Sequence, residues 1–205
     1  MNPNYATTHH WYAEWLLFMG RIDEAIAEIT LAAELDPLSP AILKDKGMTF
    51  YYAGKFDEAI DMAKKTLELD PGFAPAHRLL SLSYQGKGML AEAIAENQRW
   101  GELNKNPPET ALGLAQLLAA SGRRAEALAL IEGLPREKLS AGALMRGIAL
   151  VYAALGESDQ AIAWLEKAGE IRSEAISSLK IDHKFKHLRS DPRFKALLKK
   201  IGVEK

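Results

Sequence analysis

The same order of glycine, acidic, small and aliphatic positions recurs five times along the chain. In each copy a glycine is followed by one or two acidic residues, then by alanine and an aliphatic residue. The copies cover residues 20–26, 54–60, 88–94, 122–128 and 156–162, so consecutive glycines lie 34 positions apart. Internal repeats with a fixed period of about 20–50 residues indicate an array of stacked units, in which each unit shares its core with its neighbours.

This order predicts that each copy joins two helices. Glycine ends the first helix because it adopts the left-handed conformation at low cost. The acidic residues then fall in the first turn of the second helix, where their charge complements the helix dipole. The alanine lets two helices approach closely, and the aliphatic residue faces the shared core. The predicted helices cover about residues 6–19 and 23–35, a stretch from Pro40, 57–69, a stretch from Ala74, 91–103, 108–121, 125–133, a stretch from Ser140 to 155, and 159–170.

The last part of the chain has a different pattern. Residues 173–179 are expected to form a short helix, and Ser190-Asp191-Pro192 is a cap that opens another helix ending before Gly202. Four apolar residues of that helix share one face: Phe194, Leu197, Leu198 and Ile201. We therefore expect an array over residues 1–172, with repeats at about 6–39, 40–73, 74–107, 108–141 and 142–172, and a helical cap over residues 173–205.

These residues resemble the tetratricopeptide repeat (TPR) family. Its small residue at repeat position 8 corresponds to Ala13, Gly47, Ser81, Ala115 and Ala149, and its bulky residue at position 11 to Leu16, Phe50, Tyr84, Leu118 and Tyr152. The resemblance implies an all-α, right-handed solenoid of five helix-turn-helix repeats. Three features depart from the family pattern: Lys46 at an apolar position, Trp100 at a small position, and a fourth repeat shortened by Gly133 and Pro135.

Residues 181–198 are also similar to the closing segment of TPR arrays in bacterial multidomain regulators. In addition, the first predicted helix is apolar and aromatic, whereas a repeat array usually opens on a polar cap. We therefore expect the chain to be the regulatory or assembly part of a larger bacterial protein. The alternative is a natural start with a tolerated apolar first helix.

Composition argues against several kinds of function. The net charge is −1, so no general attraction to nucleic acid or to acidic lipid is expected. Cysteine is absent, which excludes disulfides, thiolate catalysis and cysteine-ligated metal sites and fits either a reducing or an oxidising compartment. No signal peptide or long apolar stretch is visible, so we expect a soluble, cytoplasmic protein. No phosphate-binding loop or nucleophile elbow occurs, and the carboxylates are mostly explained by the repeat. We expect no enzyme activity and no cofactor.

Histidines do not predict a metal site from the sequence. His9 and His10 are adjacent, so on a helix they point in different directions. His183 and His187 are four residues apart, which suits two ligands on a helix, but no third ligand is evident near them. The sequence therefore predicts no bound metal.

The resemblance implies that the first helix of each repeat lines a concave groove that binds a peptide or a helix. The predicted groove residues are His10, Trp11, Glu14, Phe18, Lys44, Asp45, Met48, Tyr51, Tyr52, Arg78, Leu82, Gln85, Gln116 and Arg146. Trp11, Tyr51 and Arg78 are the expected anchors, because aromatic residues and arginine dominate interface energetics. The alternative is that the aromatic residues pack between adjacent helices.

Two further expectations concern the partner. Chaperone-binding TPR domains hold a peptide's terminal carboxylate with a basic clamp, and the corresponding positions here are His10, Glu14, Asp45, Pro75 and Leu79, which do not form one. Co-chaperone function of that type is therefore not expected. The second hypothesis for function is self-association, with the first helix forming a homo-oligomer.

Overall fold

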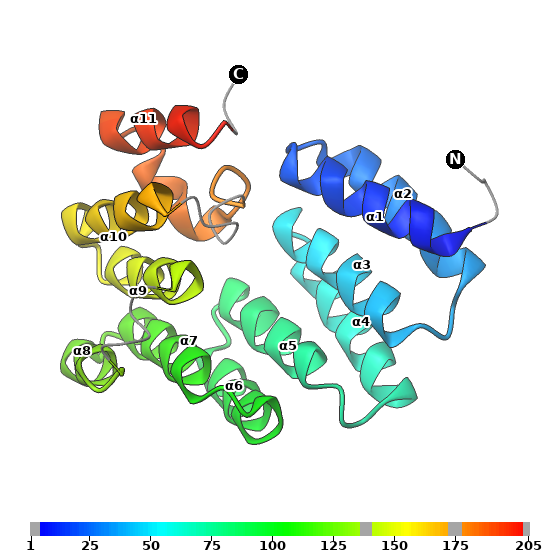
Figure 1. The fold of residues 1–205 in the computed structure, drawn as a ribbon. Helices are drawn as coiled ribbons and strands as arrows, with labels where there is room; N and C mark the ends of the chain where they lie inside the picture. Colours follow the sequence, from blue (N-terminus) through cyan, green and yellow to red (C-terminus); the bar gives the residue numbers. More distant parts are fainter. Residues whose placement is uncertain (1–4, 136–140, 172–177, 203–205) are drawn as a thin grey trace. The chain divides into compact units, whose positions relative to one another are not determined.

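The computed structural model describes residues 5–135, 141–171 and 178–202, which form helices joined by short segments (Figure 1). The helices are α1 (Ala6–Phe18), α2 (Ile22–Leu35), α3 (Pro40–Tyr52), α4 (Phe56–Leu69), α5 (Ala74–Gly86), α6 (Leu90–Asn104), α7 (Pro107–Ala120), α8 (Arg124–Glu132), α9 (Gly142–Ala154), α10 (Ser158–Glu170), the 3-10 helix η3 (His183–Leu188) and α11 (Pro192–Lys200). The predicted all-α class and the predicted helix pairs are confirmed. Ser140 and residues 173–177, which were assigned to a cap and to a short helix, lie outside the described residues.

The repeated glycines end the first helix of each pair, as the sequence predicts. All five have a φ of 75–76°, the left-handed region that glycine adopts without strain. At the first of them, the backbone N–H of Gly20 donates to the carbonyl of Leu17, and that of Arg21 donates to Leu16. These bonds satisfy carbonyl groups that the helix end leaves without intrahelical partners.

The repeated alanines lie at the centre of the packing. Ala25, Ala59, Ala93, Ala127 and Ala161 are all fully buried. A larger side chain at these positions would separate the two helices of a pair, which is why the pattern keeps a small residue there. The fourth repeat has a short second helix, α8, as its Gly133 and Pro135 predict.

The chain divides into two compact units between Lys105 and Asn106. In unit 1, residues 1–105, the pairs α1–α2, α3–α4 and α5–α6 pack in chain order. Lys105 ends α6 in the left-handed conformation, with a φ of 52°. Pro107 then begins α7, where a missing backbone N–H costs no helical hydrogen bond.

In unit 2, residues 106–205, α7 packs on α8 and α9, and α9 packs on α10. The last helix, α11, packs against α10, and its Phe194 and Leu197 are buried in one core with Ile162 and Leu165. Asp191 caps α11 by accepting a hydrogen bond from the backbone N–H of Arg193 at 2.8 Å. The boundary between array and cap at residue 172 stays a prediction.

Candidate functional site

A pocket of about 190 Å³ opens on the first-helix face of unit 1. It lies between α1, α3 and α5, the first helices of three successive repeats. Seven of the predicted groove residues line it: Glu14, Phe18, Lys44, Asp45, Met48, Tyr52 and Arg78. Its remaining lining residues are Ala13, Leu17, Ile29, Thr49 and Pro75.

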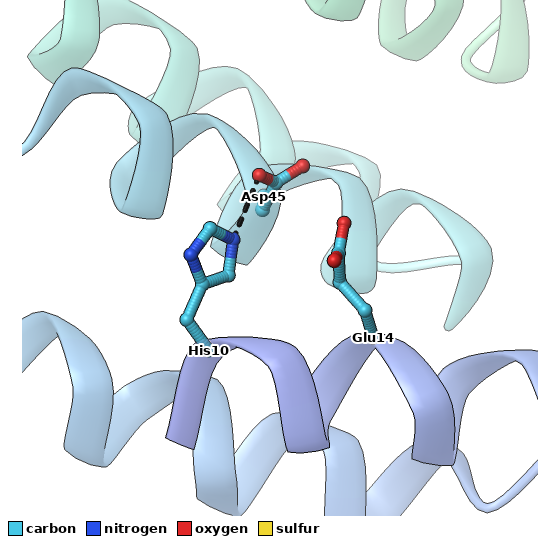
Figure 2. Close-up of side chains that lie close together, drawn as sticks. All are labelled: His10, Glu14 and Asp45. Atoms are coloured by element: carbon cyan, nitrogen blue, oxygen red, sulfur yellow. Dashed lines mark hydrogen bonds and ion pairs between the residues drawn. The ribbon is translucent and has the colours of Figure 1, made fainter. Parts of the chain in front are cut away.

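One wall of the pocket is polar and is organised around Asp45. Its Oδ2 lies 2.9 Å from His10 Nε2 (Figure 2). Its Oδ1 accepts a hydrogen bond from Lys44 Nζ. Glu14 lies one helical turn from His10 on α1, and Figure 2 shows both side chains on the side of α1 that faces Asp45 on α3.

The pKa values of His10 and Asp45 favour the charged forms of both side chains. The hydrogen bond to Asp45 raises the pKa of His10 above its usual value, against the opposing effect of burial. Burial alone would raise the pKa of Asp45, but the contacts with His10 and Lys44 outweigh it and lower that pKa. His10 and Asp45 therefore form a charge-assisted pair inside the first-helix face.

The opposite side of the pocket carries Arg78, which is exposed. Its guanidinium carbon lies 5.3 Å from the ring centroid of Trp100 on α6. Trp100 departs from the family pattern, and the structure shows what it contacts: it is buried and lies under this arginine. Among the residues that the structure describes, Arg78 forms no ion pair with a carboxylate.

Several predicted groove residues of unit 1 lie elsewhere. Tyr51 is only 2% exposed and packs edge-on against Tyr52, with Phe56 at a ring distance of 5.9 Å. The Tyr51 side chain therefore fills the space between helices, which is the alternative to its prediction as an anchor for a partner. Leu82 and Gln85 are half-buried and do not line the pocket. Trp11 is 68% exposed and lies outside it.

The equivalent face of unit 2 is covered by the chain's own C-terminal segment. Arg146 on α9 forms an ion pair with Asp182, whose side chain is 2% exposed. The guanidinium carbon of Arg146 lies 6.0 Å from the ring centroid of Phe185. Gln116 on α7 accepts a hydrogen bond from Lys184 Nζ at 3.3 Å. These two predicted groove residues therefore contact the C-terminal segment of their own chain.

Sequence reasoning missed two parts of this arrangement. The sequence singled out Trp100 as an exception but offered no partner for it. It also gave Asp182 and Phe185 no contact with Arg146, although both lie in the segment 181–198 that the sequence singled out. Among the described residues, no helix is both long and apolar enough to cross a membrane.

Comparisons with known proteins support this fold. A thermophilic TPR protein of Thermus thermophilus, TTC0263, aligns with a TM-score of 0.66 at 21% identity, over 94% of this chain and 98% of that one. YrrB, described as a TPR protein with an unusual peptide-binding site, aligns with a TM-score of 0.52 at 22% identity, over 87% of this chain and 92% of that one. The first TPR of Spaghetti (RPAP3), solved with an HSP90 peptide, aligns with a TM-score of 0.53 at 20% identity, over 60% of this chain and 97% of that one.

At these identities the structural likenesses show the fold alone. No curated protein matches the chain. The comparisons give no evidence for a bacterial multidomain regulator, so that context stays a prediction. The family model described as Tetratricopeptide repeat matches residues 44–107 and 112–175, which is more than half of the sequence. The chain therefore belongs to the tetratricopeptide repeat family.

Proposed function

We propose that this chain is a non-catalytic scaffold that binds a peptide segment on the first-helix face of unit 1. TPR proteins generally bind proteins or peptides, and YrrB and the RPAP3 domain are described with a peptide-binding site and a bound peptide. Half of the predicted groove residues meet in the unit 1 pocket. The pocket therefore gives the proposal a defined place in the chain.

One observation carries the choice of ligand. Arg78 and Arg146 lie two repeat periods apart, so they hold the same position in their first helices. Arg146 has an aromatic ring and an acidic partner, both supplied by the C-terminal segment. Arg78 has the aromatic ring, from Trp100, but no acidic partner among the described residues.

The proposed ligand supplies what Arg78 lacks. Its acidic side chain would pair with the guanidinium, which already lies over the ring of Trp100 and so loses less freedom on binding. A neighbouring apolar side chain would enter the pocket between Leu17, Phe18 and Met48. This mode differs from the basic clamp for a terminal carboxylate, because the wall opposite Arg78 contains Glu14 and Asp45.

Selection of random peptides displayed on phage against the full chain tests this proposal. We expect the selected peptides to combine an acidic and an apolar residue. Arg78→Gln should weaken their binding by about tenfold, the effect of losing one hydrogen bond to a charged group. Fluorescence anisotropy with labelled peptides measures the change.

Arg99→Gln is the matched control, because Arg99 is an exposed arginine on α6 that pairs with Glu102 and does not line the pocket. It should leave peptide affinity unchanged. Equal binding by the wild type and by Arg78→Gln would contradict the assignment of the site, as would selected peptides without acidic residues.

Self-association is a second candidate, favoured by the aromatic surface of α1. Trp11 and Trp15 are both exposed there, and Tyr12 stacks on Trp15 with ring centroids 5.8 Å apart. Burial of such rings between two copies is a strong source of binding energy. Light scattering over a range of concentrations tests it: a mass that rises in the wild type and not in Trp11→Ala supports a dimer, and a constant monomer mass excludes one.

A further inference from the structure

Three potential metal ligands converge beside the unit 1 pocket. One donor atom each from His10, Glu14 and Asp45 lies within 4.8 Å of the other two (Figure 2). No other group of three or more His, Cys, Asp or Glu side chains in the described parts of the chain brings its donor atoms this close. From this convergence we propose that His10, Glu14 and Asp45 form a binding site for a divalent transition metal, with Zn²⁺ as its best-suited ion.

The positions of the three residues make the site well ordered. His10 and Glu14 are four residues apart on α1, so their side chains leave the same face of the helix. Asp45 comes from the middle of α3, which is the first helix of the next repeat. Ligands carried by two packed helices keep their geometry better than ligands carried by loops.

The distances fit a zinc site after small side-chain rotations. Zinc ligands about 2.0–2.1 Å from the metal lie about 3.3 Å from one another in a tetrahedron. His10 Nε2 and Asp45 Oδ2 are 2.9 Å apart. Glu14 forms no hydrogen bond or ion pair with another described residue, so its carboxylate turns without losing a contact.

The donor set selects the kind of metal. One imidazole with two carboxylates suits Zn²⁺ and the neighbouring transition metals, whereas Mg²⁺ and Ca²⁺ prefer oxygen ligands alone. Three protein ligands leave a fourth position open. Glu14 and Asp45 line the pocket, so that open position would be reached from the same space that we assign to the peptide.

Lys44 has a defined part in this proposal. Its ammonium group donates a hydrogen bond to Asp45 Oδ1, so in the metal-free protein it supplies positive charge to that carboxylate. A bound Zn²⁺ supplies that charge instead and competes with the ammonium group for Asp45. Removing the charge at residue 44 should therefore strengthen metal binding, a result that a purely structural ion network does not produce.

Isothermal titration of the untagged, metal-free full chain with ZnCl₂ tests the site, and the absorption spectrum of the Co²⁺ form reports its geometry. We expect one ion per chain. His10→Asn and Glu14→Gln should each weaken binding by at least about tenfold, because the loss of an outer-shell partner alone costs 10–100-fold. Lys44→Met should bind more tightly, and Glu14→His should retain binding because imidazole is also a ligand.

His77→Asn is the matched control. His77 Nδ1 lies 2.7 Å from Glu96 Oε2. These two residues form a histidine–carboxylate pair that has no third potential ligand among the described residues. This variant should bind zinc as the wild type does. Circular dichroism of each metal-free variant checks that its fold is unchanged.

The opposite results overturn the proposal. They are an absence of zinc binding, zinc affinity that is unchanged in both His10→Asn and Glu14→Gln, or affinity that falls in Lys44→Met. No peptide enters the titration, so its outcome is separate from that of the proposed peptide site.

Discussion

The two units are built from the same repeat, but they differ in what covers their first-helix faces. In unit 1 the face between α1, α3 and α5 contains a pocket with the exposed Arg78 at its side. In unit 2 the equivalent arginine, Arg146, is taken up by Asp182 and Phe185 of the C-terminal segment. The two arginines hold the same position in their first helices, but only Arg146 is paired with an acidic side chain of the described residues.

This difference has a physical cause. A repeat packs through its small and aliphatic positions, which are alike in both units. On the first-helix face, residues such as Glu14 and Arg78 lie outside that core, so their type varies from repeat to repeat without changing the packing. In unit 2 the bound segment belongs to the same chain, so its binding is intramolecular and does not cost the translational and rotational entropy of a second molecule.

Replacing each of the two equivalent arginines by alanine should reveal the largest difference between the units, measured as the loss of unfolding free energy. Arg146→Ala leaves the buried Asp182 carboxylate without its ion pair, which costs about 3–5 kcal/mol of unfolding free energy. Arg78→Ala removes an exposed side chain and a cation–π contact worth at most about 1 kcal/mol. Urea unfolding followed by circular dichroism measures both losses.

Hydrogen exchange locates the effect. In Arg146→Ala, faster exchange should be confined to unit 2, beginning at α9 and η3. Equal losses of stability in the two variants would show that the C-terminal segment is not held by this contact, and the comparison between the units would fail.

Substitution of the repeated glycines should destabilise the two units to a similar extent. Gly54→Ala in unit 1 and Gly122→Ala in unit 2 each place a side chain at a φ near +75°, at a cost of about 1–2 kcal/mol. An added Cβ meets no atom within 4 Å at either position, so the cost comes from the backbone alone. Thermal unfolding should show similar losses in both.

Gly72→Ala is the control for this pair, since Gly72 lacks a positive φ and an added Cβ would make only ordinary contact with Asp70. Its stability should stay close to that of the wild type. Markedly unequal losses for Gly54→Ala and Gly122→Ala would mean that the turns of the two units are not equivalent.

The smallest change in stability is expected on replacing Asp191, the residue that caps α11. Hydrogen bonds from the side chain and backbone of Arg193 lower the pKa of Asp191. A carboxyl group with a lower pKa in the folded state stabilises the fold above its ordinary pKa of about 3.9, and this contribution is lost as the pH falls. Asp191→Ala should therefore lower the melting temperature slightly at pH 7, and the difference should narrow towards pH 3.

Asp191→Asn separates charge from capping, because asparagine also caps helix N-termini well. It should lose less stability than Asp191→Ala at pH 7. A difference between Asp191→Ala and the wild type that grows as the pH falls would contradict the assigned direction of the pKa shift.

Much of the fold could be predicted because its signals are local. A glycine that ends a helix, a proline that begins one and an alanine between two helices act within a few residues of their own positions. Ser39 shows this: its Oγ accepts a hydrogen bond from the backbone N–H of Ile42, and Pro40 begins α3, as predicted. The same local rules located the short α8.

The candidate site was only partly predictable. Repeat positions placed Glu14, Asp45 and Arg78 on the first-helix face, and these residues do line the pocket. The same rule placed Tyr51 there, but the bulky neighbours Tyr52 and Phe56 enclose it, and position alone does not say which of two adjacent tyrosines turns inward. His10 was not predicted as a metal ligand, because the sequence paired it with the adjacent His9, which points in another direction on the helix. The carboxylates that approach it come from the next turn of α1 and from α3.

The sequence by itself determined the helices, their pairing and the family, because each rests on residues that act on their near neighbours. Only the tertiary structure decided which first-helix face is filled and which side chains converge. Those outcomes depend on contacts between distant residues, such as His10 with Asp45, 35 positions apart, and Gln116 with Lys184, 68 positions apart. No local pattern specifies such pairs, since they form only when packed helices bring the side chains together.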